Sequence, residues 1–250
     1  MRVRHIVGVQ QQESRAPRER VHPDARLADL AARQHGVVSR SQLHILGLSD
    51  SAVRHRVAVK RLQRIHTSVY AVALPLLPRA RYMAAVLACG EGAALSHNAA
   101  AAHVGLRAAP SGPIDVTVVR AGGRRRPGIA LHVTGSLPDQ EVTEKDGIRC
   151  TTAMRTLVDL AAVVRHPSEL NRVLERALVL DLFDRNALDT VIEASNGRRG
   201  LRLLRELVAD LTDEAPPVSS ELERLTLGII LAGGFPDAVI NGHIGELQVD

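Results

Sequence analysis

The sequence predicts an α+β protein divided into several units, and three patterns lead to this fold class. Short capped helices followed by a hairpin pattern fill the N-terminal part, helices and alternating apolar runs share the middle, and a helix followed by a hairpin pattern stands at the end. The expected divisions are a disordered basic tail (1–23), a first domain (24–74), a linker (73–81), a mixed α/β middle domain (82–211), a second linker (212–220) and a C-terminal segment (218–250).

Composition narrows the class of protein without naming a function. Of the 250 residues, 45% are hydrophobic but only 2% are aromatic, so the cores must be built from Leu, Val, Ile and Ala. A net charge of +5 permits a polyanionic partner. Cys89 and Cys150 lie far apart without zinc-ligand spacing, which argues against a metal centre or a disulfide framework. Without a signal peptide or a long apolar run, we expect a cytoplasmic protein that is not bound to a membrane.

The first domain begins with three short helices. Asp24 is the expected cap of the first helix, whose apolar positions follow helical spacing, and Gly36 ends it. Ser39 and Gln42 have the spacing of a capping box that opens the second helix. Ser49 is the expected cap of the third helix. The positions expected to face inward are Leu27, Leu30, Ala31, Leu43, Leu46, Val53 and Val57.

A short β-hairpin over residues 62–72 follows, with its turn near Thr67 and Ser68. Three helices followed by a hairpin are the order of a winged helix-turn-helix, in which the third helix enters the major groove of DNA and the hairpin is the wing. Between Ser39 and Pro78 there are six basic residues and one acid, Asp50, although a solvated basic surface would give the same count. We predict double-stranded DNA as partner and place Arg54, His55, Ala58 and Arg61 on one stripe of the third helix. The full set of predicted contacts is Arg40, Ser51, Arg54, His55, Ala58, Lys60, Arg61, Arg64 and His66.

The run "LAARQHGVVSRSQLHILGLSDSAVRHRVAVKRLQRIHTSVYAV" resembles the N-terminal winged-helix domain of AbiEi-type antitoxins from type IV toxin–antitoxin systems. The resemblance continues through "IDVTVV" and "IRCTTAMRTLVDLAAV" in the middle domain. It implies a DNA-binding bacterial regulator that acts on its own promoter. By looser analogy it implies neutralisation of a toxin, so that a cognate toxin or a second copy of the chain is a further candidate partner.

The middle domain carries weaker signals. Residues 114–119 and 129–134 alternate as paired strands do, and Thr151 or Thr152 is expected to cap a helix that buries Leu157. The connection between the strands contains the Arg124–Arg126 run, which is either an exposed loop or a second contact with DNA or with an acidic partner. His97 and His103 do not have the spacing of a metal pair.

The C-terminal segment resembles the start of a restriction-endonuclease-like domain related to very-short-patch repair nucleases. In that resemblance Glu223, or Glu221, takes the helix position and Asp250 the first metal-binding Asp, and the chain stops before the next catalytic strand. Paired carboxylates would hold Mg²⁺ in a complete site. With these positions vestigial, we expect no catalytic residues, no cofactor and no enzymatic activity. Apart from the resemblance, the two glutamates favour a helix start simply as acids.

These patterns are compatible with three functions. The first is a DNA-binding transcriptional regulator of the AbiEi-antitoxin type. The second is a fragment of a metal-dependent DNA endonuclease fused to a DNA-binding domain. The third is a protein-interaction module that neutralises a toxin. DNA binding without cleavage favours the first, metal-dependent cleavage the second, and co-purification with a neighbouring gene product the third.

Overall fold

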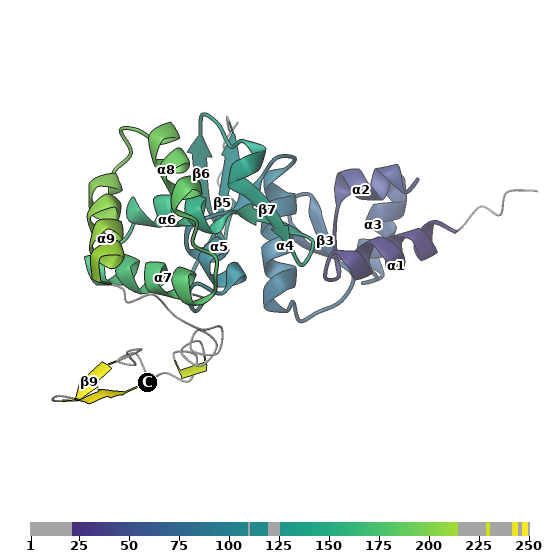
Figure 1. Cartoon of the computed structure of the whole chain (residues 1–250). Coiled ribbons are helices and arrows are strands. Elements are labelled where there is room, and N and C mark those ends of the chain that lie inside the picture. The colour runs from purple at the N-terminus through teal and green to yellow at the C-terminus, as the bar shows by residue number, and fades with distance from the viewer. Residues whose placement is uncertain are drawn as a thin grey trace, which may run out of the picture.

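The computed structural model describes residues 22–109, 111–119, 126–214, 229–230, 242–244 and 247–249. Its N-terminal unit is a winged helix-turn-helix in which a three-stranded sheet stands beside three helices (Figure 1). The sheet has the order β1-β3-β2, and all its strands are antiparallel. The elements in chain order are α1 (Pro23–Arg33), β1 (Val37–Ser39), α2 (Arg40–Ile45), α3 (Asp50–Ala58), β2 (Gln63–His66) and β3 (Val69–Ala71).

The local signals for these helices are largely confirmed. Ser39 accepts a hydrogen bond from the backbone N–H of Gln42 while the Gln42 side chain accepts one from the Ser39 N–H, which completes the capping box. Ser49 caps α3 through the N–H of Ala52. The cap of α1 was predicted wrongly: His22 is the cap residue, because Pro23 opens the helix and places Asp24 inside its first turn. Strand β1 was not foreseen, since three residues are too few for a periodic signal.

The middle unit is built on a five-stranded mixed sheet of order β6-β5-β4-β8-β7. The predicted strand pair 114–119 and 129–134 is confirmed, and its strands run parallel. Strand β4 also pairs in parallel with β8. The elements are α4 (Pro78–Cys89), β4 (Ala94–Leu95), α5 (His97–Val104), β5 (Ile114–Val119), β6 (Ile129–Thr134), the 3-10 turn η1 (Asp139–Glu141), β7 (Val142–Lys145) and β8 (Ile148–Thr151).

Four further helices form a layer at the end of the middle unit that is remote from the winged helix (Figure 1, green). They are α6 (Ala153–Ala161), α7 (Pro167–Val179), α8 (Arg185–Ala194) and α9 (Leu201–Glu214). Helix α6 is the centre of this layer: Thr152 caps it, and every one of its residues from Met154 to Ala161 is buried. Helix α9 continues to Glu214, past residue 212 where the second linker was predicted to begin.

Helix α4 joins the two units into one hydrophobic core. It begins at Pro78, inside the predicted linker, and lies between the winged helix and the five-stranded sheet (Figure 1). Val37, Val69 and Ala71 of the winged-helix sheet belong to the same buried cluster as Met83 and Ala84 of α4. The first domain predicted at 24–74 therefore shares part of its buried core with the middle unit.

Polar contacts reinforce the same junction at the turn between β7 and β8. The ring Nε2 of His35 lies 2.7 Å from the carbonyl oxygen of Asp146. The Asp146 carboxylate also pairs with Arg79 at the start of α4, at 3.0 Å. The orientation of the winged helix relative to the middle unit is thus fixed by contacts from both sides of the short linker.

Several sequence predictions concern residues outside the described ranges. They include the basic tail, Arg124, Arg125, Glu221, Glu223 and Asp250. The predicted terminal hairpin is present as β9 (Gly242–Ile244) and β10 (Leu247–Val249), which pair antiparallel. Within the described part of the chain, no helix has the length and apolar character needed to cross a membrane.

Candidate nucleic-acid interface

Helix α3 presents one exposed face and buries the other. Val53 is buried against the small core between the helices and the sheet, and it fixes the rotation of the helix. With about 100° between successive residues, the opposite side carries Ser51, Arg54, His55 and Ala58, all of which are exposed. Of the stripe predicted from the sequence, Arg54, His55 and Ala58 lie together on this exposed surface, and Ser51 lies beside them.

The start of α3 is tied to α2 by a charged cluster. Arg40 makes a bidentate pair with Asp50, with Nη2 at 2.6 Å from Oδ2 and Nε at 3.1 Å from Oδ1. The ring Nε2 of His44 lies 2.7 Å from the same Oδ1. The hydrogen bond from Arg40 lowers the pKa of Asp50, so the carboxylate stays ionised. Arg40 was predicted as a DNA contact, but in the free protein its charge is matched by Asp50.

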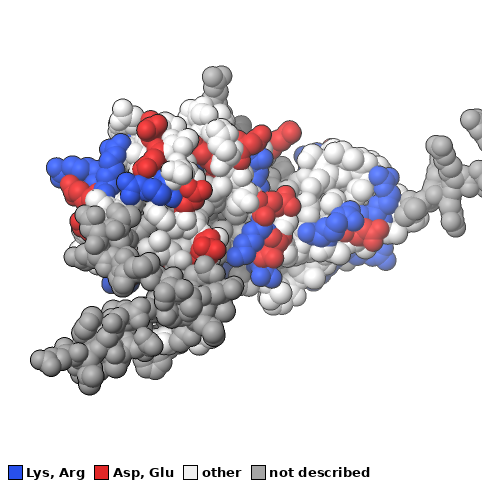
Figure 2. Space-filling model, in the orientation of Figure 1, with Lys and Arg blue, Asp and Glu red and all other residues white. Residues whose placement is uncertain are grey.

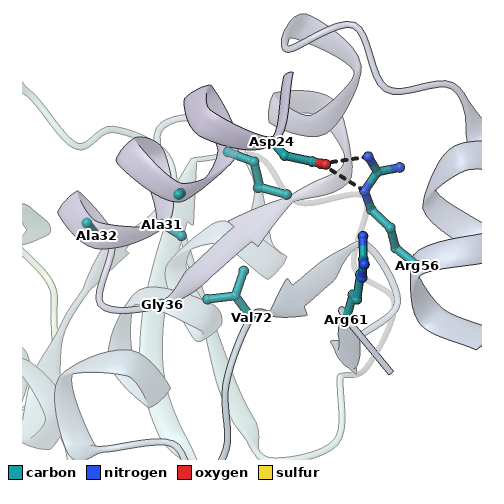
Figure 3. A pocket seen from close by; sticks show the side chains of 9 residues that line it. Asp24, Ala31, Ala32, Gly36, Arg56, Arg61 and Val72 are labelled. Carbon is teal, nitrogen blue, oxygen red and sulfur yellow. Dashed lines mark hydrogen bonds and ion pairs between the residues drawn. The ribbon is translucent and has the colours of Figure 1, made fainter. Parts of the chain in front are cut away.

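Arg56 points away from the exposed face and binds α1 instead. Its Nη2 lies 2.6 Å from Asp24 Oδ1 (Figure 3). Its Nη1 donates to the carbonyl oxygen of Ala52 at 3.2 Å. The hydrogen bond between Arg56 and Asp24 is the main reason why the pKa of Asp24 is lowered. Both residues line a pocket of about 510 Å³, whose other lining residues are mainly apolar residues of α1 and Val72. Arg56 thus sets the packing of α3 against α1.

Arg61 does not share the stripe of Arg54, so this part of the prediction was wrong. Helix α3 ends at Ala58, and Lys60 adopts a φ of 59° that turns the chain. The backbone N–H of Arg61 then donates to the Arg56 carbonyl oxygen at 2.8 Å, and the Arg61 side chain lines the pocket beside α1 (Figure 3). No glycine marks this turn in the sequence, so helical periodicity carried the predicted stripe too far.

The wing is the hairpin of β2 and β3. Arg64 is exposed on β2, opposite Tyr70 in the register, while His66 is only half-buried at the end of the strand. Burial, and next to it the charge of Arg126, lower the pKa of His66, so its imidazole is neutral at pH 7. Arg126 lies just before β6, at the end of the arginine-rich connection. Its effect on His66 shows that the positive charge of Arg126 acts on the wing from the middle unit.

Charge on the surface is mixed in sign. On the face in Figure 2, Lys and Arg side chains of the winged helix lie among acidic groups, and basic groups also gather over the remote helical layer. Net charge alone would not locate an interface on such a surface. The exposed face of α3 is distinguished by its residue types and by its position next to the wing.

Comparison with known proteins gives two family matches. Residues 25–73 match the model described as "Transcriptional regulator, AbiEi antitoxin", and residues 88–209 match "AbiEi antitoxin C-terminal domain". Together they span about two thirds of the chain. No curated protein matches. Among solved structures, the RV2827C protein from Mycobacterium tuberculosis is 16% identical with a TM-score of 0.48, over 83% of this chain and 80% of that one.

Proposed function

The chain belongs to the AbiEi family of antitoxins and is a DNA-binding transcriptional regulator of that type, and we propose that it acts at its own promoter through α3 and the wing. In this proposal α3 enters the major groove of double-stranded DNA. Arg64 of the wing and Lys60 at the helix end contact phosphates on either side. Autoregulation of this kind links the amount of antitoxin to the transcription of its own gene.

The observation that carries the proposal is the chemistry of the exposed face of α3. Arg54 is the only guanidinium on that face of the described helix, because Arg56 is held by Asp24 on the other side. A guanidinium can bond both acceptors of a guanine edge, while the Ala58 methyl suits the methyl group of thymine. Ser51 and His55 are the other side chains on this face, so it carries no acidic group that the phosphates along the groove would repel.

The test is binding of the full chain to a labelled duplex from its own upstream region, measured by fluorescence anisotropy over a range of salt concentrations. If Arg54 reads a base, Arg54→Ala should weaken the binding free energy by about 1–3 kcal/mol, which is a loss of about 5- to 150-fold in affinity. Arg64→Ala should lower the log–log salt slope by about 0.9, as expected for one phosphate contact.

Arg205→Ala is the matched control. It removes the same charge from an exposed position on α9, remote from α3, and should leave affinity and slope unchanged. If Arg54→Ala and Arg205→Ala bind the upstream duplex alike, α3 is not the recognition helix. If the native chain binds this duplex no better than a scrambled one, autoregulation through this region is wrong.

For a protein partner, we propose that the middle unit binds a cognate toxin, since residues 88–209 match the antitoxin C-terminal domain. Co-expression of the chain with the product of the neighbouring gene, followed by size-exclusion chromatography, tests this partner. A complex that survives Arg54→Ala would show that the toxin and DNA use different surfaces. A neighbouring product that elutes separately from the native chain would contradict it.

A further inference from the structure

A polar pocket in the middle unit lies on the side of the sheet covered by α6. Its volume is about 410 Å³, within the range of small-molecule sites. Its walls come from strand β5, strand β6 at the sheet edge, the first residue of α5, helix α6 and the turn before α9. Its polar lining includes His97, Thr117, His132, Asp159, Arg198 and Arg199.

One wall is an ionic network that the sequence did not reveal. Arg155 of α6 binds Glu141 and donates from Nε to Asp159 Oδ1 at 2.9 Å. Arg198 reaches the same oxygen at 2.9 Å and donates through Nη2 to Thr134 Oγ1 at 3.1 Å. Both arginines therefore use one carboxylate oxygen of Asp159.

Two polar atoms of the pocket residues lack a hydrogen bond within the described part of the chain. Asp159 Oδ2 and Thr117 Oγ1 are buried and have no hydrogen-bond partner in the described part of the chain. Asp159 is 1% exposed and Thr117 is 2% exposed. A buried polar group without a partner is unfavourable, so a ligand that supplies donors gains at both positions.

The histidine pair adds a second polar wall. The rings of His97 and His132 are stacked with centroids 3.7 Å apart, and His132 Nε2 lies 2.8 Å from Asp115 Oδ1. His97 holds a φ of 46°, a left-handed conformation that is uncommon for a residue other than glycine. Burial lowers the pKa of His97 to about 4, so its ring is neutral at pH 7.

The charged residues that line the pocket are Arg155, Arg198, Arg199 and Asp159, which leaves an excess of positive charge. Arg199 is exposed at the rim, and the Arg198 side chain is 32% exposed over Asp159. Glu141 offsets part of the excess by pairing with Arg155. Within the described residues, no group of His, Cys, Asp and Glu is suited to a metal ion. The site thus combines unused inner acceptors with guanidinium groups at its mouth.

We propose that this pocket binds a small molecule with neutral N–H or O–H donors at one end and a phosphate at the other, the chemistry of a nucleoside monophosphate. The phosphate lies at Arg199 and draws the Arg198 guanidinium outward. That movement uncovers Asp159 Oδ2, which accepts from an amino group of the base, while Thr117 Oγ1 bonds a second polar atom. A neutral donor suits Asp159 better than an ammonium group, because the Arg155 guanidinium still pairs with its Oδ1 after Arg198 moves outward.

Isothermal titration calorimetry of the full chain with the four ribonucleoside 5′-monophosphates tests the proposal. At least one should bind, and its nucleoside and inorganic phosphate alone should each bind at least 10-fold more weakly. Arg199→Ala should weaken binding about 10- to 100-fold, as for a charged hydrogen bond, and the isosteric Thr117→Val about 3- to 10-fold. Because the Thr117 hydroxyl has no partner in the described chain, Thr117→Val should keep or raise the melting temperature.

Arg205→Ala again serves as the matched control, since it removes an exposed guanidinium outside the pocket and should leave the nucleotide affinity unchanged. The proposal is overturned if none of the four monophosphates binds, or if binding survives both pocket variants. Inorganic phosphate that binds as tightly as the nucleotide would overturn it too, because the inner acceptors would then contribute nothing.

Discussion

Replacing Arg155 with Met should destabilise the middle unit severely. The Arg155 side chain is 3% exposed, and its partners Glu141 and Asp159 are 6% and 1% exposed. Burial alone would lower the pKa of Arg155, but the two carboxylates outweigh it and raise that pKa. Met fills a similar volume, so the main effect is electrostatic. Removing one partner of a buried pair costs about 3–5 kcal/mol, because the other charge is left without compensation.

The assay is urea denaturation of the full chain followed by circular dichroism, with Glu141→Gln added in a double-mutant cycle. Asp159 keeps Arg198 as a partner, so Glu141 is the carboxylate that Arg155→Met leaves uncompensated. The double variant should therefore be more stable than Arg155→Met alone. The reasoning is refuted if Arg155→Met costs less than about 1 kcal/mol, or if Glu141→Gln destabilises it further.

Three other predictions concern stability. Burial lowers the pKa of His97 from 6.5 to about 4, so between these pH values the His97 ring is protonated in the unfolded chain but not in the folded one. The unfolding free energy should therefore drop by up to about 3 kcal/mol as the pH falls through this range. His97→Asn, measured by urea titration at pH 7 and pH 4.5, should remove most of that drop. In Gly200→Ala the new Cβ would collide with the Ala161 carbonyl, so this change should lower the melting temperature far more than Gly197→Ala, where φ is similar but the space is open. Equal shifts of the melting temperature in the two variants would show that the close approach of Gly200 to α6 does not matter. Ser39→Ala should cost about 1 kcal/mol in unfolding free energy through loss of the capping box, and an unchanged value would mean that the box is not formed in solution.

The sequence was sufficient wherever the determining interaction is local. Ser39 and Ser49 were identified as caps because the atoms that they bond lie three residues ahead. The exposed face of α3 followed from Val53 and helical geometry alone, and the hairpin at 62–72 followed from its alternation. The order of these elements was enough to predict the winged helix, and the motifs carried the resemblance that the family matches confirm.

Tertiary structure decided which charges are available for function. Arg54 and Arg56 look alike in the sequence, yet only Arg56 meets Asp24, which lies 32 residues away and reaches it through the packing of α1 on α3. Arg198 and Asp159 are 39 residues apart, and they meet because the turn at Gly200 approaches the end of α6. Such pairs leave no periodic pattern, since their spacing is set by the path of the backbone between them. The sequence by itself thus determined the helices, their caps and the kind of domain, whereas the packing of distant segments determined the polar pocket and the shared core around α4.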